Sequence, residues 1–388
     1  MSFRTLPALL FIATAFVLTG CNKATNNDTN AAGELIVRIG SAAPLTGNQA
    51  HIGKDNESGT RMAIDDANAK GITIGGRKVH FELISEDDQA DPKTATIVAQ
   101  KLVDDKVNGV IGHLNSGTTI PASKIYNDNG IAQISPSATA VNYTAQGFKT
   151  AFRVMANDAQ QGRVLGEYAA RNLGAKKIAV IDDRTAYGQG LADEFIKAAQ
   201  AAGAQIVAHE YTNDKAVDFT AVLTAVKGKQ PDLLFYGGMD PQSGPMAKQI
   251  KALALNVKFM TGDGGYTPEY IKLAGDAAEG SYATLPGVPL GKMPGGKAFE
   301  TRFVAKYQPI QLYAPYCYDA VNVMIAAMQK ADSVEPVKYL PELAKISYDG
   351  VTAKIQFDAK GDLQGGAITL YQVQQGKWQA LETLGAAH

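Results

Sequence analysis

The sequence predicts an α/β protein in which two parallel sheets are covered by helices. Short apolar runs alternate with amphipathic helical patterns along most of the 388 residues, which is the pattern of βαβ units. The alternation starts again after Asn157, and parallel strands need a long crossover connection, usually a helix. Two separate series of such units therefore predict two lobes, each with its own parallel sheet.

The first series begins with an alternating apolar segment at residues 34–42, as expected for a strand. A loop is predicted at residues 44–53. A short helix is predicted to begin at Pro121, because proline is favoured in a first helical turn. The other helices of this series are predicted at residues 57–69 and 93–105, and the other strands at residues 78–85, 109–114, 131–134 and 151–155.

The second series begins with a helical pattern at residues 158–173. A loop at residues 183–188 leads from its first strand into a helix that ends near Ala202. Further helices are predicted at residues 220–227 and 245–253, and strands at residues 177–182, 205–211, 233–236 and 258–260.

Beyond Leu285 the pattern changes. Residues 286–296 are rich in proline and glycine and predict a loop. Elements of both kinds this late in the chain predict a return crossing between the lobes instead of a third domain. The helices are predicted at residues 297–307, 316–331 and 337–345, and the strands at residues 353–357, 368–373 and 378–381.

The first 20 residues are predicted to be a secretory signal peptide. Arg4 precedes an apolar run at residues 6–18, and a Leu-Thr-Gly triplet stands directly before Cys21. A cysteine in this place resembles the lipobox of bacterial lipoproteins, which predicts that Cys21 is lipidated and begins the mature chain. The alternative is an ordinary signal peptide that ends at a cysteine. Residues 21–33 are polar and predict a disordered tether that holds the protein near a membrane.

Charge and composition exclude several classes of protein. The formal net charge is −1, which argues against nucleic-acid binding because that needs a basic surface. No run beyond Leu18 is apolar for long enough to span a bilayer. Cys21 and Cys317 are the two cysteines. With Cys21 lipidated no intramolecular disulfide can form, so we expect packing to supply the stability.

Hydroxyl-rich loops after two predicted strands indicate a ligand site. Residues 115–119 include Ser116, and residues 135–139 include Ser137 and Thr139. Such strand ends meet at the carboxyl edge of a parallel sheet, where ligands bind. The free N–H groups of a helix start, beside hydroxyl groups, suit a small anion such as a carboxylate. The alternative is ordinary helix capping, for which serine and threonine are also preferred.

Sequence motifs of catalysis, phosphate binding and metal binding are absent. No G-x-S-x-G, G-x-x-x-x-G-K-[ST] or G-x-G-x-x-G motif occurs. The 5 histidines never stand three or four residues apart, as a local pair of metal ligands would, so we expect no metal and no cofactor. His113 is expected to be structural, and the acidic residues 86–91 a hydrated loop. We predict neither an enzyme nor a DNA-binding regulator.

Six segments in order resemble the periplasmic leucine/isoleucine/valine-binding proteins, the substrate receptors of branched-chain amino-acid ABC importers. The similarity runs from about Leu35 to Trp378. The segments are PLTG (44–47), VIGHL (110–114), ISPSAT (134–139), YGQGL (187–191), YGG (236–238) and KGDL (360–363).

The resemblance implies a type 1 periplasmic binding protein, in which two Rossmann-like lobes joined by three crossover strands close on a ligand like a Venus flytrap. Lobe 1 would comprise residues 34–157 and 287–365, and lobe 2 residues 158–286 and 366–388. The implied function is an extracytoplasmic, periplasmic receptor that delivers a small aliphatic amino acid to ABC permease subunits. We expect a monomer that meets the membrane only through its lipid anchor.

The resemblance also implies roles for individual residues. Ser116, through its hydroxyl and N–H groups, and the Thr139 N–H would receive the α-carboxylate of the amino acid. The ammonium group would meet the Ser137 carbonyl, the Thr139 hydroxyl and the Asp263 carboxylate, with Ala138 between the two loop residues. Tyr187 would reach across from lobe 2 when the cleft closes.

Departures from the family pattern affect the expected specificity. Asp263 stands where a longer glutamate is usual, Ile52 replaces an aromatic residue and Met239 replaces a tyrosine, whereas Tyr313 keeps an aromatic position. An apolar, softer pocket for an aliphatic side chain is therefore expected, and an amide or an aromatic carboxylate remains an alternative ligand. Two functional alternatives also remain, a sensor of the same fold and a hydrolase that uses Asp263 and Tyr187.

Overall fold

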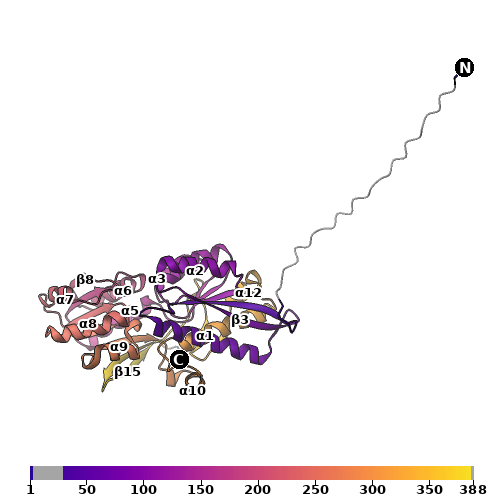
Figure 1. The fold of residues 1–388 in the computed structure, drawn as a ribbon. Helices are drawn as coiled ribbons and strands as arrows, with labels where there is room; N and C mark the ends of the chain where they lie inside the picture. Colours follow the sequence, from indigo (N-terminus) through magenta and orange to yellow (C-terminus); the bar gives the residue numbers. More distant parts are fainter. Residues whose placement is uncertain (3–28, 386–388) are drawn as a thin grey trace.

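The computed structural model describes residues 1–2 and 29–385, and its strands form two large sheets (Figure 1). Most strand pairings are parallel and helices connect the strands, which confirms the predicted fold class. Most of the predicted signal peptide, Cys21 and most of the predicted tether lie outside the described residues. Within the described part of the chain, no helix is long and apolar enough to cross a membrane.

The first sheet has 6 strands in the order β2-β3-β1-β4-β5-β6, and all pairings except β2 with β3 are parallel. Helices α2 and α3 pack on one face and α1 on the other (Figure 1), and α11 packs beside α1. We call this sheet with its helices lobe 1. Its elements are β1 (Leu35–Ala43), α1 (Ala50–Lys70), β2 (Thr73–Ile74), β3 (Arg77–Asp87), α2 (Pro92–Asp104), β4 (Gly109–Gly112), α3 (Ser116–Asp128), β5 (Gln133–Ser135), α4 (Asn142–Ala145), β6 (Ala151–Arg153), α10 (Gly296–Val304), α11 (Ala314–Lys330), α12 (Pro336–Leu343), β12 (Ser347–Asp349) and β13 (Lys354–Gln356).

The second sheet has 7 strands in the order β15-β14-β11-β10-β9-β7-β8. The five strands from β11 to β8 run parallel, and the C-terminal hairpin of β14 and β15 adds antiparallel pairings at one edge. We call this sheet with its helices lobe 2. Its elements are α5 (Asp158–Glu167), β7 (Lys177–Asp182), α6 (Ala186–Ala201), β8 (Gln205–Tyr211), α7 (Thr220–Lys227), β9 (Leu233–Gly237), α8 (Asp240–Ala252), β10 (Lys258–Thr261), the short helix η2 (Asp263–Gly265), α9 (Pro268–Ala274), β11 (Tyr282–Pro286), β14 (Ile368–Gln374) and β15 (Lys377–Leu384).

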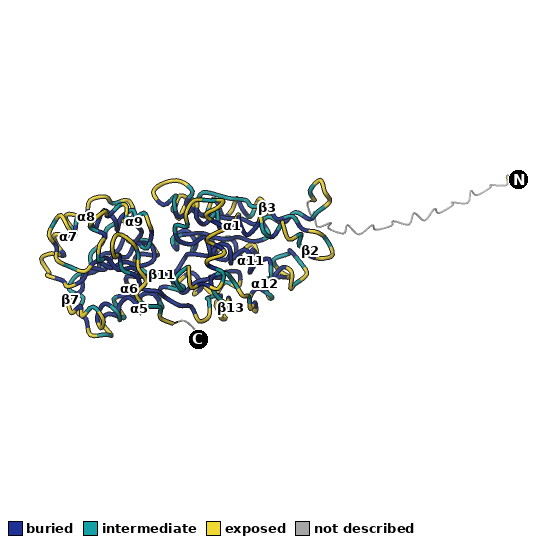
Figure 2. The backbone as a smooth tube through the Cα atoms, turned by 90° about the horizontal axis from the view of Figure 1, so that it is seen from below, coloured by how far each residue is buried: buried dark blue, intermediate teal, exposed yellow. Residues whose placement is uncertain are grey.

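The central strands of lobe 2 are buried on both faces, which explains their continuous apolar runs. Ile178 and Val180 of β7 pack with α5 and α6, whereas Ala179 and Ile181 pack with α7, α8 and α9. Figure 2 shows buried backbone along the strands of both lobes and exposed backbone mainly on loops and outer helix faces. Each lobe thus has a layer of helices on either side of its sheet.

The chain passes between the lobes three times, after β6, after β11 and after β13. Backbone hydrogen bonds join these connections side by side, from Arg153 N to Gly361 O (2.9 Å) and from Gly287 N to Ala367 O (2.6 Å). The structure therefore contains the crossovers that the resemblance implies. The residue boundaries of the lobes stay a prediction of the sequence.

Helix α1 begins at Ala50, seven residues earlier than predicted, so Ile52 lies in a helix and not in a loop. Gly53 permits this start. A Cβ atom on Gly53 would lie 1.9 Å from the carbonyl oxygen of Pro44, and only glycine lets the helix approach the preceding loop so closely. The first turn of α1 is polar, so the spacing of apolar residues did not predict it.

Helix α3 also begins earlier than predicted, at Ser116, and Pro121 lies inside it. The Asn115 carbonyl accepts hydrogen bonds from the N–H groups of Thr118 and Thr119 (3.1 and 2.9 Å) and from both of their hydroxyl groups (2.9 and 2.8 Å). Serine, glycine and threonine have modest helix propensity. Local hydrogen bonds therefore set the start of this helix, and the sequence pattern did not reveal them.

Strand β11 and helix α9 were missed, and α8 begins five residues before its predicted start. Each of these segments is short or begins with proline, glycine and polar residues, so it lacks a clear apolar period. Strand β11 is buried along its whole length between β10 and β14. These elements form because they are buried in the folded protein, and such burial can outweigh the local sequence pattern.

Candidate ligand-binding site

The predicted site residues of lobe 1 lie together at the carboxyl edge of the first sheet. Ser116 begins α3 after β4, and residues 137–139 follow β5. The Ala140 N–H donates to Ser116 Oγ (3.1 Å), and the Ser137 hydroxyl donates to the Leu114 carbonyl (3.0 Å). The two loops therefore hold each other in place, as the sequence analysis expected for neighbouring strand ends.

The start of α3 supplies N–H donors to this edge. The N–H groups of Ser116 and Gly117 lie in the first helical turn, where the helix itself provides no acceptor. Ser116 is only 1 % exposed and Gly117 is half-buried, so the Ser116 N–H is largely shielded from solvent. Together with the positive end of the helix dipole, the two N–H groups suit a small anion.

Lobe 2 contributes the carboxylate of Asp263, at the start of η2 after β10. Its oxygens accept hydrogen bonds from the hydroxyl groups of Tyr187 (2.7 Å) and Tyr313 (2.7 Å) and from Gln161 Nε2 (3.0 Å). Burial raises the pKa of Asp263, and the three donors oppose that shift. A carboxylate has about four lone-pair positions, so Asp263 keeps the capacity to accept one more N–H group.

Tyr313 is the point where this network crosses between the lobes. It precedes α11 in lobe 1, whereas Tyr187 belongs to α6 and Gln161 to α5, both in lobe 2. Its backbone N–H donates to the buried Asp55 carboxylate of α1 (2.8 Å). Side chains of both lobes therefore donate to Asp263.

Gln161 is a site residue that sequence reasoning missed. Its Oε1 atom accepts hydrogen bonds from the Asp263 N–H (2.9 Å) and from the Thr284 hydroxyl (2.7 Å), while its Nε2 atom donates to the Asp263 carboxylate. The buried Gln161 amide thus bonds both the backbone N–H and the carboxylate of Asp263, which fixes the rotamer of Asp263. A glutamine within a helical pattern gives no sequence signal for this role.

Asp158, the first residue of α5, was also missed. Burial raises its pKa to about 8, and the nearby negative charge of Asp263 adds to that shift. Among the described residues, neither Asp158 Oδ2 nor Thr139 Oγ1 has a hydrogen-bond partner. Asp158 follows Asn157, which caps α5. Acidic residues are common in the first turn of a helix, so the sequence gave no reason to single out Asp158.

The residues predicted to line an apolar pocket are buried close to these groups. Met239 and Tyr187 surround Gly264, where a Cβ atom would lie 2.7 Å from Met239 Sδ. Ile52 lies on the same face of α1 as Asn56, four residues on, and Asn56 Nδ2 donates to Ser137 Oγ (3.4 Å). All nine predicted ligand residues are at most 6 % exposed, so solvent is largely excluded from the site.

His113 and the acidic residues 86–91 belong to the framework of lobe 1. The buried His113 ring lies 2.8 Å from Asp88 Oδ2 and 3.0 Å from the Tyr126 hydroxyl. Asp91 caps α2 by accepting from the Thr94 N–H (2.7 Å). Among the residues that the structure describes, no group of three His, Cys, Asp or Glu residues is placed to hold a metal ion.

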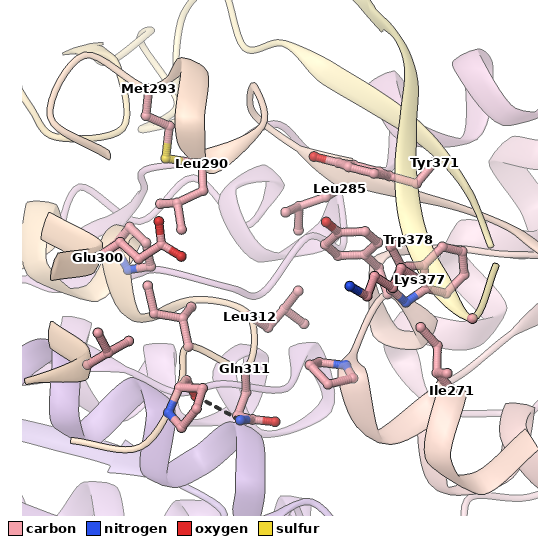
Figure 3. Close-up of a pocket in the computed structure, with 17 residues that line it drawn as sticks. Ile271, Leu285, Leu290, Met293, Glu300, Gln311, Leu312, Tyr371, Lys377 and Trp378 are labelled. Atoms are coloured by element: carbon pink, nitrogen blue, oxygen red, sulfur yellow. Dashed lines mark hydrogen bonds between the residues drawn. The ribbon is translucent and has the colours of Figure 1, made fainter. Parts of the chain in front are cut away.

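A separate apolar cavity of about 470 Å³ lies between the lobes. Figure 3 shows Tyr371 and Trp378 on one side of it and Leu290 and Met293 on the other. None of the nine predicted ligand residues lines this cavity. It is therefore distinct from the polar site around Asp263.

Residues 36–377 match the model of a family described as periplasmic binding protein. The chain is similar to the leucine-, isoleucine-, valine-, threonine- and alanine-binding protein of Pseudomonas aeruginosa, with 36% identity over 337 residues that cover 87% of this chain and 89% of the relative. Its fold is similar to that of the leucine-binding protein LivK of Thermotoga maritima (TM-score 0.83, 27% identity, 89% of this chain and 98% of that chain). It is also similar to the branched-chain amino acid transporter substrate-binding protein LivJ of Streptococcus pneumoniae, solved with isoleucine (TM-score 0.82, 27% identity, 90% of this chain and 99% of that chain).

Proposed function

We propose, from the premise that the chain belongs to the periplasmic binding protein family, that it is the substrate-binding protein of an ABC importer and binds a small aliphatic amino acid between its lobes. Two similar proteins support the substrate class: one is a leucine-, isoleucine-, valine-, threonine- and alanine-binding protein, and the other was solved with isoleucine. The observation that carries the proposal is the buried Asp263 carboxylate opposite a helix start rich in N–H and hydroxyl donors.

This arrangement suits the two charges of an amino acid. A zwitterion that enters a closed site loses the hydration of both charges, which costs several kcal/mol for each charge unless both are paired. Neutral donors at Ser116 and Thr139 meet the α-carboxylate. Asp263, the Ser137 carbonyl and the Thr139 hydroxyl meet the ammonium group, which has three N–H donors.

Binding proceeds in two stages. The donors of lobe 1 receive the ligand in an open form, and closure then brings Asp263 and Tyr187 of lobe 2 to its ammonium end. The ligand binds the closed form better because only that form supplies the carboxylate, so it shifts the equilibrium toward closure. The closed form is the one that docks on the permease.

The side chain of the ligand occupies the apolar surroundings of Ile52, Met239 and Tyr313. One methylene in such a pocket changes affinity by about 1–3 kcal/mol. The proposal therefore concerns small aliphatic amino acids as a class.

The remaining features of the proposal concern location. Cys21 is lipidated, residues 21–33 tether the folded chain, and the protein acts as a monomer at the outer surface of a membrane. The Leu-Thr-Gly triplet before Cys21 and the polar composition of residues 22–33 support this placement.

A thermal-shift screen tests the proposed substrate class. The purified protein is heated with aliphatic amino acids, with their amides and with aromatic carboxylates in separate wells. A ligand at 100 times its dissociation constant adds ~2.7 kcal/mol of stability, so leucine, isoleucine, valine or alanine should raise the melting temperature. Stabilisation by benzoate or by an amide alone would replace the proposed ligand class, and chromatography of the incubated amides reports any hydrolysis.

A further inference from the structure

One side-chain pair joins the lobes outside the predicted ligand contacts. His51 Nε2 of α1 lies 2.7 Å from Asp240 Oδ2 of α8, and the two residues are 189 positions apart in the sequence. The His51 side chain is 22% exposed and that of Asp240 is fully buried. His51 directly precedes Ile52, and Asp240 directly follows Met239, so the pair lies beside two residues of the proposed pocket.

The lobe 2 side of this pair is fixed by its own contacts. The Thr267 hydroxyl donates to Asp240 Oδ2 (2.6 Å), and the same hydroxyl oxygen caps α9 by accepting from the Tyr270 N–H (2.9 Å). The Thr267 carbonyl accepts from the Trp378 indole N–H (3.1 Å). Asp240 is thus held in position by lobe 2 alone, and His51 is the partner that arrives when the lobes close.

We propose that His51 and Asp240 form a latch that stabilises the closed form and makes retention of the amino acid depend on pH. This inference rests on the proposed function, because it concerns closure around the same ligand. The latch acts through the position of the lobes, and neither residue needs to touch the ligand.

Negative charge surrounds the His51 ring on the elements packed against it. Burial lowers the pKa of His51, but the hydrogen bond and charge of Asp240, with smaller contributions from Glu269 of α9 and Asp55 of α1, raise it above the ordinary value. Lys54, Glu57 and Lys306 line the same recess in lobe 1. Of the groups that act on His51, Asp240 and Glu269 belong to lobe 2, so opening the lobes removes their effect.

The direction of the pH effect follows from this difference. In the open form the pKa of His51 returns toward its ordinary value, so the closed form binds the proton more tightly than the open form. The latch gives its full stabilisation of the closed form below the pKa of the open form, and that stabilisation is lost as pH rises through the raised pKa of the closed form. The ligand is therefore retained best on the acidic side of this window.

The first test compares leucine dissociation constants of the unaltered protein and His51→Gln by calorimetry, from about pH 5.5 to about pH 8.5. Glutamine keeps a neutral donor but cannot gain a proton. We compare the two affinities as a ratio, that of the unaltered protein divided by that of the variant. This ratio should fall by roughly two- to fivefold from the acidic to the basic end of the range, as for a partly exposed ion pair. Asp158 and Asp263 titrate in both proteins, so the ratio of the two affinities removes their contribution.

His209→Gln is the matched control. His209 Nε2 also lies 2.7 Å from a buried aspartate, Asp182, but both residues belong to neighbouring strands of lobe 2. This variant should keep the pH profile of the unaltered protein. A change as large as that of His51→Gln would mean that loss of any histidine–aspartate pair alters the profile, which would overturn the latch.

The second test needs no ligand. Spin labels on Lys93→Cys in lobe 1 and Lys229→Cys in lobe 2, in a Cys21→Ser background, report the distance between the lobes by double electron–electron resonance. We expect the closed population to decrease more steeply as pH rises with His51 present than with His51→Gln, because Asp158 and Asp263 titrate in both proteins. Equal distance distributions at every pH in both proteins would overturn the latch. If no amino acid binds at any pH, the proposed ligand class fails and the spin-label distances still decide the latch.

Discussion

At the scale of single residues, we expect ligand affinity to depend most on Asp263. It is the carboxylate of lobe 2 that meets the proposed ammonium group, and its remaining capacity as an acceptor follows from its three known donors. The two tyrosine hydroxyl groups and the amide cannot replace it, because none of them carries a negative charge.

Asp263→Ala should cost on the order of 3–5 kcal/mol of leucine binding, because a buried ammonium group then lacks its counter-charge. Isothermal calorimetry measures this loss, and circular dichroism reports whether the fold is kept. Asp193→Ala removes an exposed aspartate on α6 of the same lobe and should leave the affinity unchanged. An unaltered dissociation constant in the Asp263 variant would remove this residue from the site.

Asp158→Asn should change how stability depends on pH. The folded protein raises the pKa of Asp158 to about 8, well above the ordinary value of about 3.9. Between these two values the folded state keeps a proton that the unfolded state has lost, so the contribution of Asp158 to the unfolding free energy falls as pH rises. The asparagine side chain does not titrate, so its contribution to the unfolding free energy does not fall with pH. Without ligand, the unfolding free energy of the variant should therefore rise relative to that of the unaltered protein by a few kcal/mol as pH increases to about 8.

Urea unfolding of both proteins at about pH 5, 6.5 and 8 measures this difference. A constant difference across the three values would mean that Asp158 is already charged at the lowest of them. We expect a nearby ammonium group to favour the charged form of this carboxyl group, so leucine binding should release protons in the range where Asp158 is neutral.

The sequence predicted some residues of the candidate site and gave no signal for others. Ser116, Ser137 and Thr139 gave a signal because hydroxyl residues follow apolar runs, and Asp263 gained its implied role from the resemblance alone. Gln161 and Asp158 gave none, because a glutamine in a helix and an aspartate beside an N-cap are common in any α/β protein. Their importance depends on burial next to Asp263, and residues 102 positions apart meet there only after folding.

At the scale of elements, one buried ion pair holds the loop that carries the ligand residues. Arg153 ends β6 and is fully buried, and its Nε atom donates to Asp362 Oδ1 (3.0 Å) on the third crossover. Its Nη1 atom donates to the carbonyl groups of Ala138 (2.8 Å) and Ala140 (2.9 Å). The crossovers therefore fix the position of the loop after β5.

Asp362→Ala should destabilise the fold by about 3–5 kcal/mol, because it leaves the Arg153 guanidinium group buried without its counter-charge. Chemical denaturation measures the change in unfolding free energy. Asp128→Ala is the control, since its pair with Lys124 is exposed and such pairs contribute at most about 1 kcal/mol. Equal effects of the two substitutions would mean that the crossover pair does not hold the loop.

Most elements were predictable from the periodicity of apolar residues. The elements that were missed or misplaced depend on features other than that periodicity. Strands β7 and β8 and helix α7 have the predicted bounds, because their apolar residues recur at regular intervals. The first turns of α1 and α3 and the whole of β11 depend on a close glycine contact, on hydrogen bonds to one carbonyl and on burial between neighbouring strands. None of these causes produces a regular apolar pattern in the sequence.

At the scale of the whole molecule, alternation of strands and helices predicts two parallel sheets but not how they are joined. Only the resemblance implied the three crossovers. The backbone hydrogen bonds among Arg153, Gly287, Gly361 and Ala367 connect segments from three separate parts of the chain. Contacts of such long sequence separation leave no periodic trace.

The position of the C-terminal hairpin has a consequence for biogenesis. Strands β14 and β15 complete an edge of the second sheet beside β11, and α11 of the first lobe is made late in the chain. Val373 of β14 belongs to the hydrophobic core of lobe 2, and Val321 and Val323 of α11 belong to that of lobe 1. Each core is therefore complete only when segments from the last third of the chain are in place, so we expect a chain truncated before α11 to leave both lobes unfinished.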